Sequence, residues 1–584
     1  MSIEASFPTI KPTLNLDFAN TKELDPRITF TRASTATYYN GETSALAEQN
    51  LVLQSQNWAN SPWMALAGLN PTVTANAGAA PDGTNTATSL LFSAQYQNRA
   101  QQVALVVGLT YTFSFYAQTT SGNTALFISY NGGSSFSPIT TTASWARYSF
   151  TFTAVANSDH LGIQDRNASG FGTTLVWGAQ LEQRSAVTAY TPTTTVAITN
   201  YIPVLLTAQA GQARFDHNPN TGESLGLEIE EQRTNLVTYS GAVGGTNWTP
   251  LNIISTLNTA IAPDGTLTAS NIIANTVNSV HYLQQLGSSL TAGTYTASCY
   301  IKAYTARYII MGLLFDNNAN RYVVIFDALN GVVVGTTGVQ GTTTNGSSTI
   351  SPVGNGWYKV SVTATTPTMT SGPFIRILNP SNNSTYNETN PFAGDGYSGV
   401  LVWGAQIEAG SFATSYIPTV ASQVTRSADA ASLTGTNFSQ WYNPSEGTLY
   451  ANGIRNSNDL SVYPRFAHLT LDGFEIYSIG IGQWTANTTT GLVFNNTVQA
   501  NITTTVSGAT FGTNIKAAIA FKTNEISATA NGLSVITDTS ATIPEIRRLY
   551  IGSNGTSMPL GGTISKIAYY PLRLTNAQLQ ALTS

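Results

Sequence analysis

The sequence predicts an all-β protein made of several antiparallel β-sandwiches of the jelly-roll type, with two tandem repeats followed by a third sandwich. Three observations predict this class. The 584 residues exceed what one core holds. Charged residues make up only 9% while aromatic residues make up 10%, whereas disordered chains are poor in aromatics. Short segments with alternating polar and apolar residues are separated by Gly, Asn and Pro.

An internal repeat predicts two of the sandwiches. Asn50-Leu51-Val52 recurs as Asn235-Leu236-Val237, and Trp177-Gly178-Ala179-Gln180-Leu181-Glu182 recurs as Trp403-Gly404-Ala405-Gln406-Ile407-Glu408. Each copy closes on Thr-x-Tyr-x-Pro-Thr, at 188–193 and 414–419. The repeat predicts jelly-roll modules over 46–196 and 231–425. The second copy carries two insertions, near Asp316–Asn355 and Pro380–Tyr397, whose composition predicts loops.

Inside the modules the local pattern has period two. Tyr111, Phe113 and Phe115 alternate with Thr112 and Ser114. Such alternation buries one face of an antiparallel strand and leaves the other in water, so these segments are expected to be strands of a sandwich.

The rest of the chain divides into four segments. Residues 443–584 predict a third sandwich that ends in a short helix, because Thr575 and Gln578 form a capping box. Residues 426–442 are expected to be a linker. Residues 1–45 and 197–230 contain short strands that are too few for separate cores. We expect these two segments to pair with each other, with the first module inserted between them, and to form a base for attachment or oligomerisation.

Several classes of protein are disfavoured. The net charge of −5 provides no basic field for nucleic acid, and no apolar run is long enough to span a membrane. The first residues lack the pattern of a signal peptide, so we expect exit from the cell by lysis or as part of a particle. The single cysteine, Cys299, excludes a disulfide within the chain and is expected to be buried.

Long strings of the sequence resemble a known family. Ile28-Thr29-Phe30-Thr31-Arg32-Ala33-Ser34-Thr35-Ala36-Thr37-Tyr38 is similar to its opening block, and the stretches 214–219, 221–227 and 229–236 are similar to its second block. The family is that of bacteriophage head-fibre, spike and tail-fibre structural proteins. The two modules also resemble jelly-roll carbohydrate-binding modules, and 443–584 resembles the concanavalin-like sandwiches of laminin-G and pentraxin type. This chain departs from the family in carrying a whole module between the two blocks.

The resemblance implies a non-enzymatic external appendage of the virion that displays sandwiches for attachment to a host. Its partners would be other capsid or tail proteins, further copies of the chain in a homo-oligomer, with a trimer favoured, and host surface glycans as candidate ligands. A capsid-decorating head fibre without a glycan ligand and a tailspike depolymerase are the alternatives.

No catalytic residues are expected. Hydrolysis of a glycan needs two positioned carboxylates. Glu228, Glu230 and Glu231 lie within a signature string, and Glu182 and Glu408 are equivalent in the repeat, so structural roles are favoured for all five.

No cofactor or metal site is expected either. The four histidines show no ligand spacing. Calcium is left open because loop carbonyls and Asp or Asn side chains suffice for it, with Asp316-Asn317-Asn318-Ala319-Asn320 and Asp395 as conceivable ligands.

The tryptophans fall into two groups. Six occupy equivalent positions in the two repeats and are expected to be core residues: Trp63 with Trp248, Trp145 with Trp357, and Trp177 with Trp403. Aromatic residues outside this pattern are better candidates for contact with a sugar, and the candidates are Trp484, Tyr386, Tyr397 and Trp58.

Overall fold

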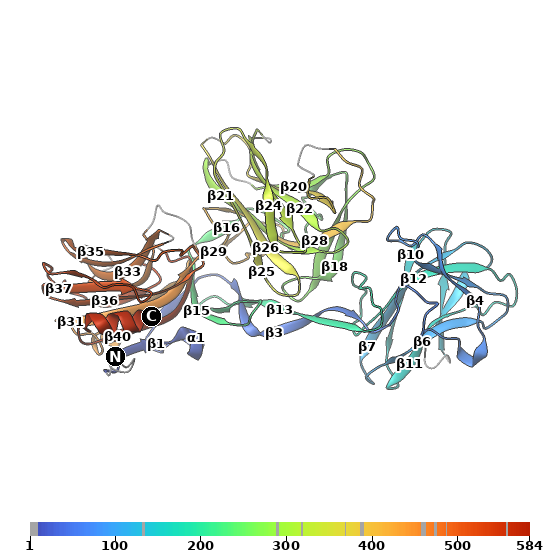
Figure 1. The fold of residues 1–584 in the computed structure, drawn as a ribbon, viewed down its shortest axis with the longest axis horizontal. Coiled ribbons are helices and arrows are strands. Elements are labelled where there is room, and N and C mark those ends of the chain that lie inside the picture. The colour runs from blue at the N-terminus through green and yellow to red at the C-terminus, as the bar shows by residue number, and fades with distance from the viewer. Residues whose placement is uncertain are drawn as a thin grey trace.

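The protein is described by a computed structural model that covers residues 10–130, 135–287, 291–316, 319–367, 369–385, 391–456, 463–471, 476–485, 487–555 and 559–584, without the side chains of Thr337 and Trp484. Strands account for 53% of the chain and helices for 4%, so the predicted all-β class is confirmed. Every strand pairing among the described residues is antiparallel. The C-terminal sandwich and the first repeat lie at the two ends, the second repeat lies between them, and a long two-stranded ribbon runs beneath the second repeat (Figure 1).

The first repeat, called module 1 (46–196), is a two-sheet sandwich with the three-residue 3-10 helix η2 (Leu66–Gly68) in a connection. Its first sheet has the order β10 (Ala146–Thr153), β7 (Thr110–Thr119), β12 (Thr173–Glu182), β5 (Ala87–Leu91), β4 (Thr72–Gly78). Its second sheet has the order β6 (Asn98–Ala104), β11 (Ser158–Gln164), β8 (Ala125–Tyr130), β9 (Ser135–Thr140).

The second repeat, called module 2 (231–425), is larger and has two six-stranded sheets. One has the order β18 (Ile253–Ile261), β19 (Leu267–Ala274), β28 (Gly399–Ala409), β21 (Gly293–Ala303), β26 (Trp357–Thr366), β25 (Thr344–Pro352). The other has the order β17 (Thr249–Leu251), β20 (Tyr282–Leu286), β27 (Phe374–Ser381), β22 (Tyr308–Phe315), β23 (Asn320–Asp327), β24 (Val332–Gln340). A short pair, β16 (Arg233–Asn235) with β29 (Val424–Arg426), closes its ends.

The two modules share the register of their central strands. Tyr116 of β7 lies opposite Trp177 of β12, and Tyr300 of β21 lies opposite Trp403 of β28. The ladder shifts immediately after the tryptophan in both copies. The repeated residues therefore occupy the same positions in the two sandwiches.

The first insertion of module 2 does not form the predicted loop. Residues 332–340 and 344–352 are the strands β24 and β25, which extend one sheet each. The prediction was wrong because Gly and Asn lie mainly at the turns, while β-branched Val and Thr between them favour strands. The described part of the second insertion contains turns and one isolated bridge between Ser279 and Phe392.

A repeated asparagine closes module 1. The Asn50 side chain donates hydrogen bonds to the carbonyls of Ala179 (2.9 Å) and Thr191 (2.8 Å). Its carbonyl oxygen accepts from the backbone amides of Val52 and Leu181. One buried amide thus ties the start of the module to its last strand and to the closing Thr-x-Tyr-x-Pro-Thr segment.

Module 2 repeats this closure. Asn235 makes the same four contacts, with Ala405, Ile417, Val237 and Ile407. The repeated glutamates also hold the closing segments. Glu182 accepts hydrogen bonds from the hydroxyl and the amide of Thr188, and Glu408 accepts the same two bonds from Thr414. These two glutamates are buried hydrogen-bond acceptors in equivalent places.

The C-terminal sandwich draws strands from three parts of the chain. One sheet has the order β14 (Phe215–His217), β15 (Ser224–Ile229), β40 (Gly562–Tyr570), β31 (Glu446–Arg455), β36 (Asn514–Lys522), β37 (Glu525–Ala530), β38 (Ile536–Asp538), and β1 (Leu14–Leu16) also pairs with β40. The other has the order β2 (Thr29–Thr31), β30 (Ala430–Thr434), β39 (Arg548–Ile551), β32 (Arg465–Thr470), β33 (Tyr477–Thr485), β34 (Thr488–Asn495), β35 (Thr497–Thr505).

This arrangement corrects the expected boundaries. The segment 426–442 is no linker, because it holds β30 and the short helix α2 (Thr436–Ser439), whose Phe438 is buried in the sandwich core. Leu14, Leu16 and Phe18, the last in helix α1 (Phe18–Thr21), lie in the same core. The beginning of the chain therefore completes the C-terminal sandwich, and its role in attachment or oligomerisation stays a prediction.

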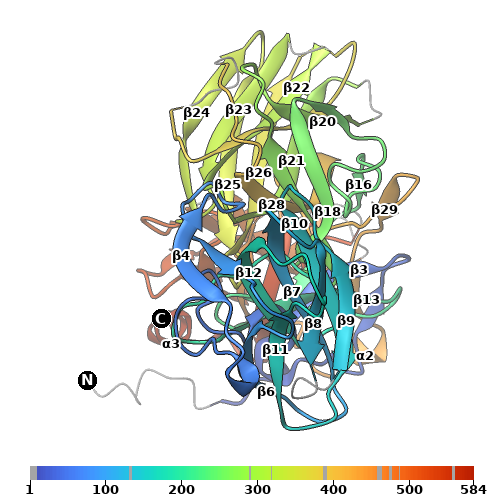
Figure 2. The same ribbon diagram turned by 90° about the vertical axis from the view of Figure 1, so that its right-hand side faces the viewer.

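The ribbon consists of β3 (Ala36–Asn50) paired with β13 (Ile198–Ala208). Its pairing runs from Ala36 opposite Ala208 to Asn50 opposite Ile198, so the 1–45 and 197–230 segments meet here, with module 1 inserted at the far end. Figure 2 shows module 1 from its outer side, with module 2 rising behind it.

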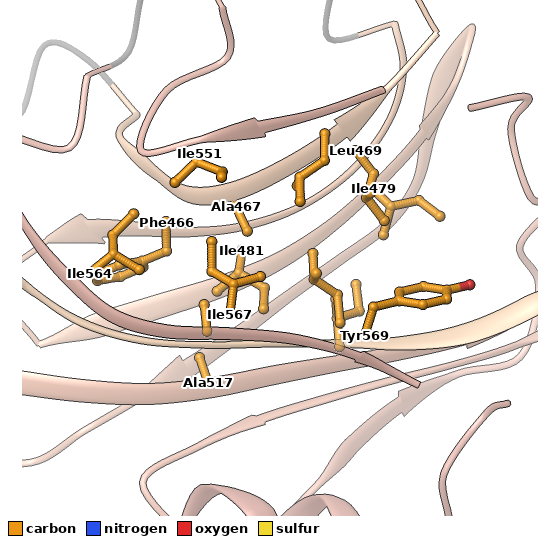
Figure 3. Close-up of a cluster of buried hydrophobic side chains, with 14 of the residues drawn as sticks. Phe466, Ala467, Leu469, Ile479, Ile481, Ala517, Ile551, Ile564, Ile567 and Tyr569 are labelled. Atoms are coloured by element: carbon orange, nitrogen blue, oxygen red, sulfur yellow. The ribbon is translucent and has the colours of Figure 1, made fainter. Parts of the chain in front are cut away.

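The core of the C-terminal sandwich is shown in Figure 3. Phe466, Leu469 and Ile479 from one sheet face Ile567 and Tyr569 from the other, and all are buried. Helix α3 (Asn576–Thr583) begins at the predicted capping box of Thr575 and Gln578. Among the helices of the described residues, none has the length and apolar character needed to cross a membrane.

Candidate functional site

The largest group of buried charges lies where the ribbon, module 2 and the C-terminal sandwich meet. Arg214 is completely buried and contacts Glu228 (2.9 Å), Glu230 (2.9 Å) and Asp429 (2.6 Å). Arg426 contacts Glu230 at 2.5 Å, and Arg32 contacts Asp429 at 2.9 Å. We call these three arginines and three carboxylates the hub. Each arginine of the hub contacts at least one carboxyl group, as burial requires.

The pKa values of the two glutamates of the hub are shifted in opposite directions. Burial opposes ionisation of Glu230, but Arg426, Arg214 and hydrogen bonds from Ser415 outweigh it and lower the pKa of Glu230 to about 2. Burial raises the pKa of Glu228 well above its ordinary value, and Arg214 offsets this only in part. Two neighbouring carboxyl groups whose pKa values are shifted apart are also a pattern of glycosidases.

The contacts of Glu230 favour a structural role for this residue over a catalytic one. One of its oxygens accepts from the backbone amide of Ser415, and the other accepts from Arg214, Arg426 and the Ser415 hydroxyl. Both oxygens are therefore engaged, although Glu228 and Glu230 border a cavity of about 480 Å³. A nucleophile or base needs an oxygen that can reach a substrate.

Most of the repeated tryptophans are core residues. Trp63, Trp177, Trp248, Trp357 and Trp403 are between 1% and 6% exposed. Trp145 is half-buried, and its indole N–H donates to the carbonyl of Ala79 at 3.0 Å.

Of the four candidates for sugar contact, only Tyr397 is both described and accessible. Trp58 is completely buried and stacks on Trp63, with 4.0 Å between ring centroids, so its prediction was wrong. A pattern search could not detect this, because Trp58 has no partner in the second repeat. Tyr386 and the side chain of Trp484 lie outside the described residues.

Tyr397 lines a cleft of about 480 Å³ between the two modules. Module 1 contributes the aromatic residues Trp177 and Tyr190, whose ring centroids lie 4.7 Å apart. Module 2 contributes Tyr304 and Tyr397. We call this space the inter-module cleft. Its volume falls within the range of ordinary ligand pockets.

Backbone contacts hold the two walls of the cleft together. The amide of Tyr190 donates to the hydroxyl of Tyr304 at 3.0 Å, and the amide of Ala189 donates to the carbonyl of Thr259 at 2.6 Å. On the other wall, the hydroxyl of Thr305 donates to the carbonyl of Tyr397 at 3.2 Å. The aromatic rings therefore belong to backbone segments whose positions are set by hydrogen bonds.

The polar groups of the cleft include Asp82 and the ion pair of Glu48 with Lys302, at 2.6 Å. Burial raises the pKa of Tyr397, and the proximity of Tyr304 and Asp82 adds to this effect. The ring of Tyr397 is thus neutral and close to the Asp82 carboxylate. Aromatic rings with a few convergent polar groups suit a ligand that carries both C–H faces and hydroxyls.

The equivalent face of module 2 is occupied by the ribbon. Trp403 and Tyr416 pack with Tyr39 and Leu205 in one buried cluster, and the Leu205 amide donates to the carbonyl of Pro263 at 2.8 Å. A smaller cavity of about 370 Å³ remains beside them. The same aromatic face is therefore covered by the chain itself in one copy and borders the inter-module cleft in the other.

Of the conceivable calcium ligands, Asn317 and Asn318 lie outside the described residues, and the two aspartates accept hydrogen bonds from backbone amides. Asp316 accepts hydrogen bonds from the amides of Thr370 and Ser371, and Asp395 accepts from the amides of Tyr397 and Ser398. Within the described ranges, no group of three or more His, Cys, Asp or Glu side chains could hold a metal ion.

Sequence reasoning missed most of the cleft. Asp82 lies in the repeated Ala-Pro-Asp-Gly motif, which is a signal that could have been followed. Tyr304 carries no such signal, because its role depends on the placement of one module against the other.

The comparisons with known proteins identify no family. The sequence matches no protein-family model and no curated protein. Among solved structures, the chain is similar to the CBM40 domain of Ruminococcus gnavus IT-sialidase bound to alpha2,3 sialyllactose (14% identity, 24% of this chain and 84% of that one, TM-score 0.22). It is also similar to the CBM22-1-CBM22-2 tandem domain of Paenibacillus barcinonensis Xyn10C (12% identity, 63% of this chain and 99% of that one, TM-score 0.20).

A third similar structure is that of domains LG4-5 of the mouse laminin alpha1 chain, with 10% identity over 50% of this chain and 84% of that one and a TM-score of 0.17. All three scores are far below 0.5. The class of the fold therefore rests on the strands described above.

Proposed function

We propose that this chain is a non-enzymatic structural protein of a bacteriophage virion, a fibre or spike subunit, that binds host surface glycans in the inter-module cleft. The observation that carries glycan binding is the meeting of the partly exposed rings of Tyr304 and Tyr397 with Asp82 around a space whose module 1 wall contains the buried Trp177 and Tyr190. Planar rings contact the apolar faces of a sugar, and polar side chains bond its hydroxyls.

The virion role is supported by the strings that resemble phage fibre and spike proteins. Their charged residues Arg32, Arg214 and Glu230 come together in the hub, which joins the ribbon, module 2 and the C-terminal sandwich. These strings therefore mark the framework that carries the modules. Assembly as a homo-oligomer, with a trimer favoured, would let several weak cleft contacts act together.

Binding to immobilised glycans tests the proposal. The Tyr397→Ala variant should lose at least tenfold in apparent affinity, because it removes one wall of the cleft. Tyr201→Ala is the matched control, since Tyr201 lies on the ribbon, is 61% exposed and does not line the cleft. Equal loss in both variants, or none in Tyr397→Ala, would contradict binding in the cleft.

A tailspike depolymerase is the second candidate, favoured by the opposite pKa shifts of Glu228 and Glu230 beside a cavity. We expect the purified protein to release no reducing ends from host polysaccharide. Release that disappears in Glu228→Gln would establish this enzyme instead. Adsorption of particles that is unchanged by every cleft variant would favour a capsid-decorating fibre without a glycan ligand.

A further inference from the structure

The ionisable side chains that line the inter-module cleft carry one excess negative charge. They comprise two carboxylates, Glu48 and Asp82, and one ammonium group, Lys302. The tyrosines of the cleft are neutral, because burial raises the pKa values of Tyr190, Tyr304 and Tyr397.

Lys302 is already engaged and cannot serve as a free cation for a ligand. Its ammonium group contacts Glu48 at 2.6 Å and donates to the carbonyl of Asn355 at 2.5 Å. The side-chain amide of Asn355 donates to the second oxygen of Glu48 at 2.8 Å. Drawing Lys302 toward an anionic ligand would leave Glu48 without its counter-charge in a largely buried place, which is costly.

Asp82, in contrast, has hydrogen-bond donors but no cation. One of its oxygens accepts from the amide (3.0 Å) and the hydroxyl (2.6 Å) of Thr84. No ion pair of Asp82 occurs within the described part of the chain. Arg147 is a cation in this region, but it lies over the ring of Tyr116 and donates to the carbonyl of Thr188, and it does not line the cleft.

We infer that the inter-module cleft accepts uncharged oligosaccharides and rejects glycans that bear a carboxylate, such as sialic or uronic acids. The inference rests on the proposed function. A ligand carboxylate would lose water on entry, would find no free cation, and would meet the charge of Asp82 in a space of low dielectric. A neutral sugar would instead offer hydroxyl donors to the Asp82 oxygens and its C–H faces to the rings.

Matched oligosaccharides test the inference by titration calorimetry on the full chain. The panel contains neutral gluco-, galacto- and manno-oligosaccharides, each with a counterpart in which one sugar is a sialic or uronic acid. We expect neutral ligands to bind at least tenfold more tightly than their acidic counterparts at low salt. Raising the salt concentration should narrow the ratio, because it screens the repulsion.

The decisive variant is Asp82→Asn, which keeps an oxygen that can accept from Thr84 and removes the charge. This variant should reduce the ratio of the affinity for neutral ligands to the affinity for acidic ligands severalfold. Asp264→Asn is the matched control, since Asp264 accepts the same two hydrogen bonds from Thr266 in module 2 and does not line this cleft. The control should leave the ratio unchanged.

The outcomes distinguish failure of the ligand class from failure of glycan binding itself. Acidic ligands that bind as tightly as neutral ones, in a manner abolished by Tyr397→Ala, would overturn the ligand class and keep glycan binding. An unchanged ratio in Asp82→Asn would overturn the role of this carboxylate. No binding by any member of the panel would overturn the proposed function and this inference together.

Discussion

The backbone amide of Tyr190 in module 1 donates a hydrogen bond of 3.0 Å to the hydroxyl of Tyr304 in module 2. Tyr304 thereby joins the two repeats at the edge of the cleft that it lines. The contact is specific to this pairing of modules. It links the placement of the modules to the shape of the candidate site.

Removing this hydroxyl should weaken the joint between the modules. Tyr304→Phe leaves the Tyr190 amide without its acceptor, which should cost about 1 kcal/mol. We expect a small decrease in thermal stability and a severalfold loss of glycan affinity, measured by calorimetry. Tyr201→Phe, on an exposed position of the ribbon, is the control and should change neither. Full affinity in Tyr304→Phe would show that the cleft does not depend on this contact.

The closing asparagines should dominate the stability of their modules. Asn235→Ala removes four hydrogen bonds and leaves buried carbonyl and amide groups unpaired, so we expect a loss of at least about 3 kcal/mol in the free energy of unfolding. Hydrogen exchange should show that the loss is confined to module 2. Asn50→Ala should act in the same way on module 1. The neighbouring Thr234→Ala, half-exposed, should cost less than about 1 kcal/mol.

The first residues of the chain should stabilise its last sandwich. Phe18 is 1% exposed and lies in the core of the C-terminal sandwich, so Phe18→Ala should cost about 3–5 kcal/mol. Hydrogen exchange in β40 is the appropriate measurement, because β1 pairs with that strand. Asn20→Ala, on an exposed position of the same helix, is the control. Unchanged protection of β40 in Phe18→Ala would mean that the sandwich folds without the N-terminal segment.

Asp216 should make the stability depend on pH. Burial raises its pKa to about 6, although the Tyr39 amide and Arg214 act in the opposite direction. The folded state therefore binds this proton more tightly than the unfolded state, whose pKa is about 3.9. Stability from this group is fully present below about pH 4 and is lost as the pH rises toward 6, by on the order of 2–3 kcal/mol.

Comparison with Asp216→Asn isolates this effect, because Asn keeps an oxygen that can accept from the Tyr39 amide. Denaturant unfolding at several pH values should show a decrease between pH 4 and 6 in the natural chain that is largely missing in the variant. Parallel profiles for the two proteins would show that Asp216 does not titrate in this range.

Local patterns were sufficient for the class of the fold and for the repeat. The alternation of Tyr111, Phe113 and Phe115 with polar residues corresponds to strand β7, whose three aromatic residues are buried. The same patterns gave wrong predictions where the conformation depends on neighbouring strands. The sequence around Val332–Val334 was interpreted as a loop, although β-branched residues in it form an edge strand of module 2.

Within the candidate site, the sequence predicted only Tyr397. That prediction used a general rule, namely that aromatic residues in loops without a repeat partner are free to contact ligands. Trp58 satisfied the same rule and is buried against Trp63. A rule based on local sequence cannot separate these two cases. Exposure depends on what the rest of the chain places over a side chain.

By itself the sequence determined the all-β class, the two repeats, the buried positions of five of the six repeated tryptophans, and the capping box of α3, because each depends on local periodicity or on a motif present twice. Only the tertiary structure decided that Leu14 and Phe18 complete the C-terminal sandwich, that Asp429 pairs with both Arg32 and Arg214, and that Tyr304 meets Tyr190. These relationships join residues far apart along the chain. Their energies come from burial and charge pairing in three dimensions, which no spacing along the sequence encodes.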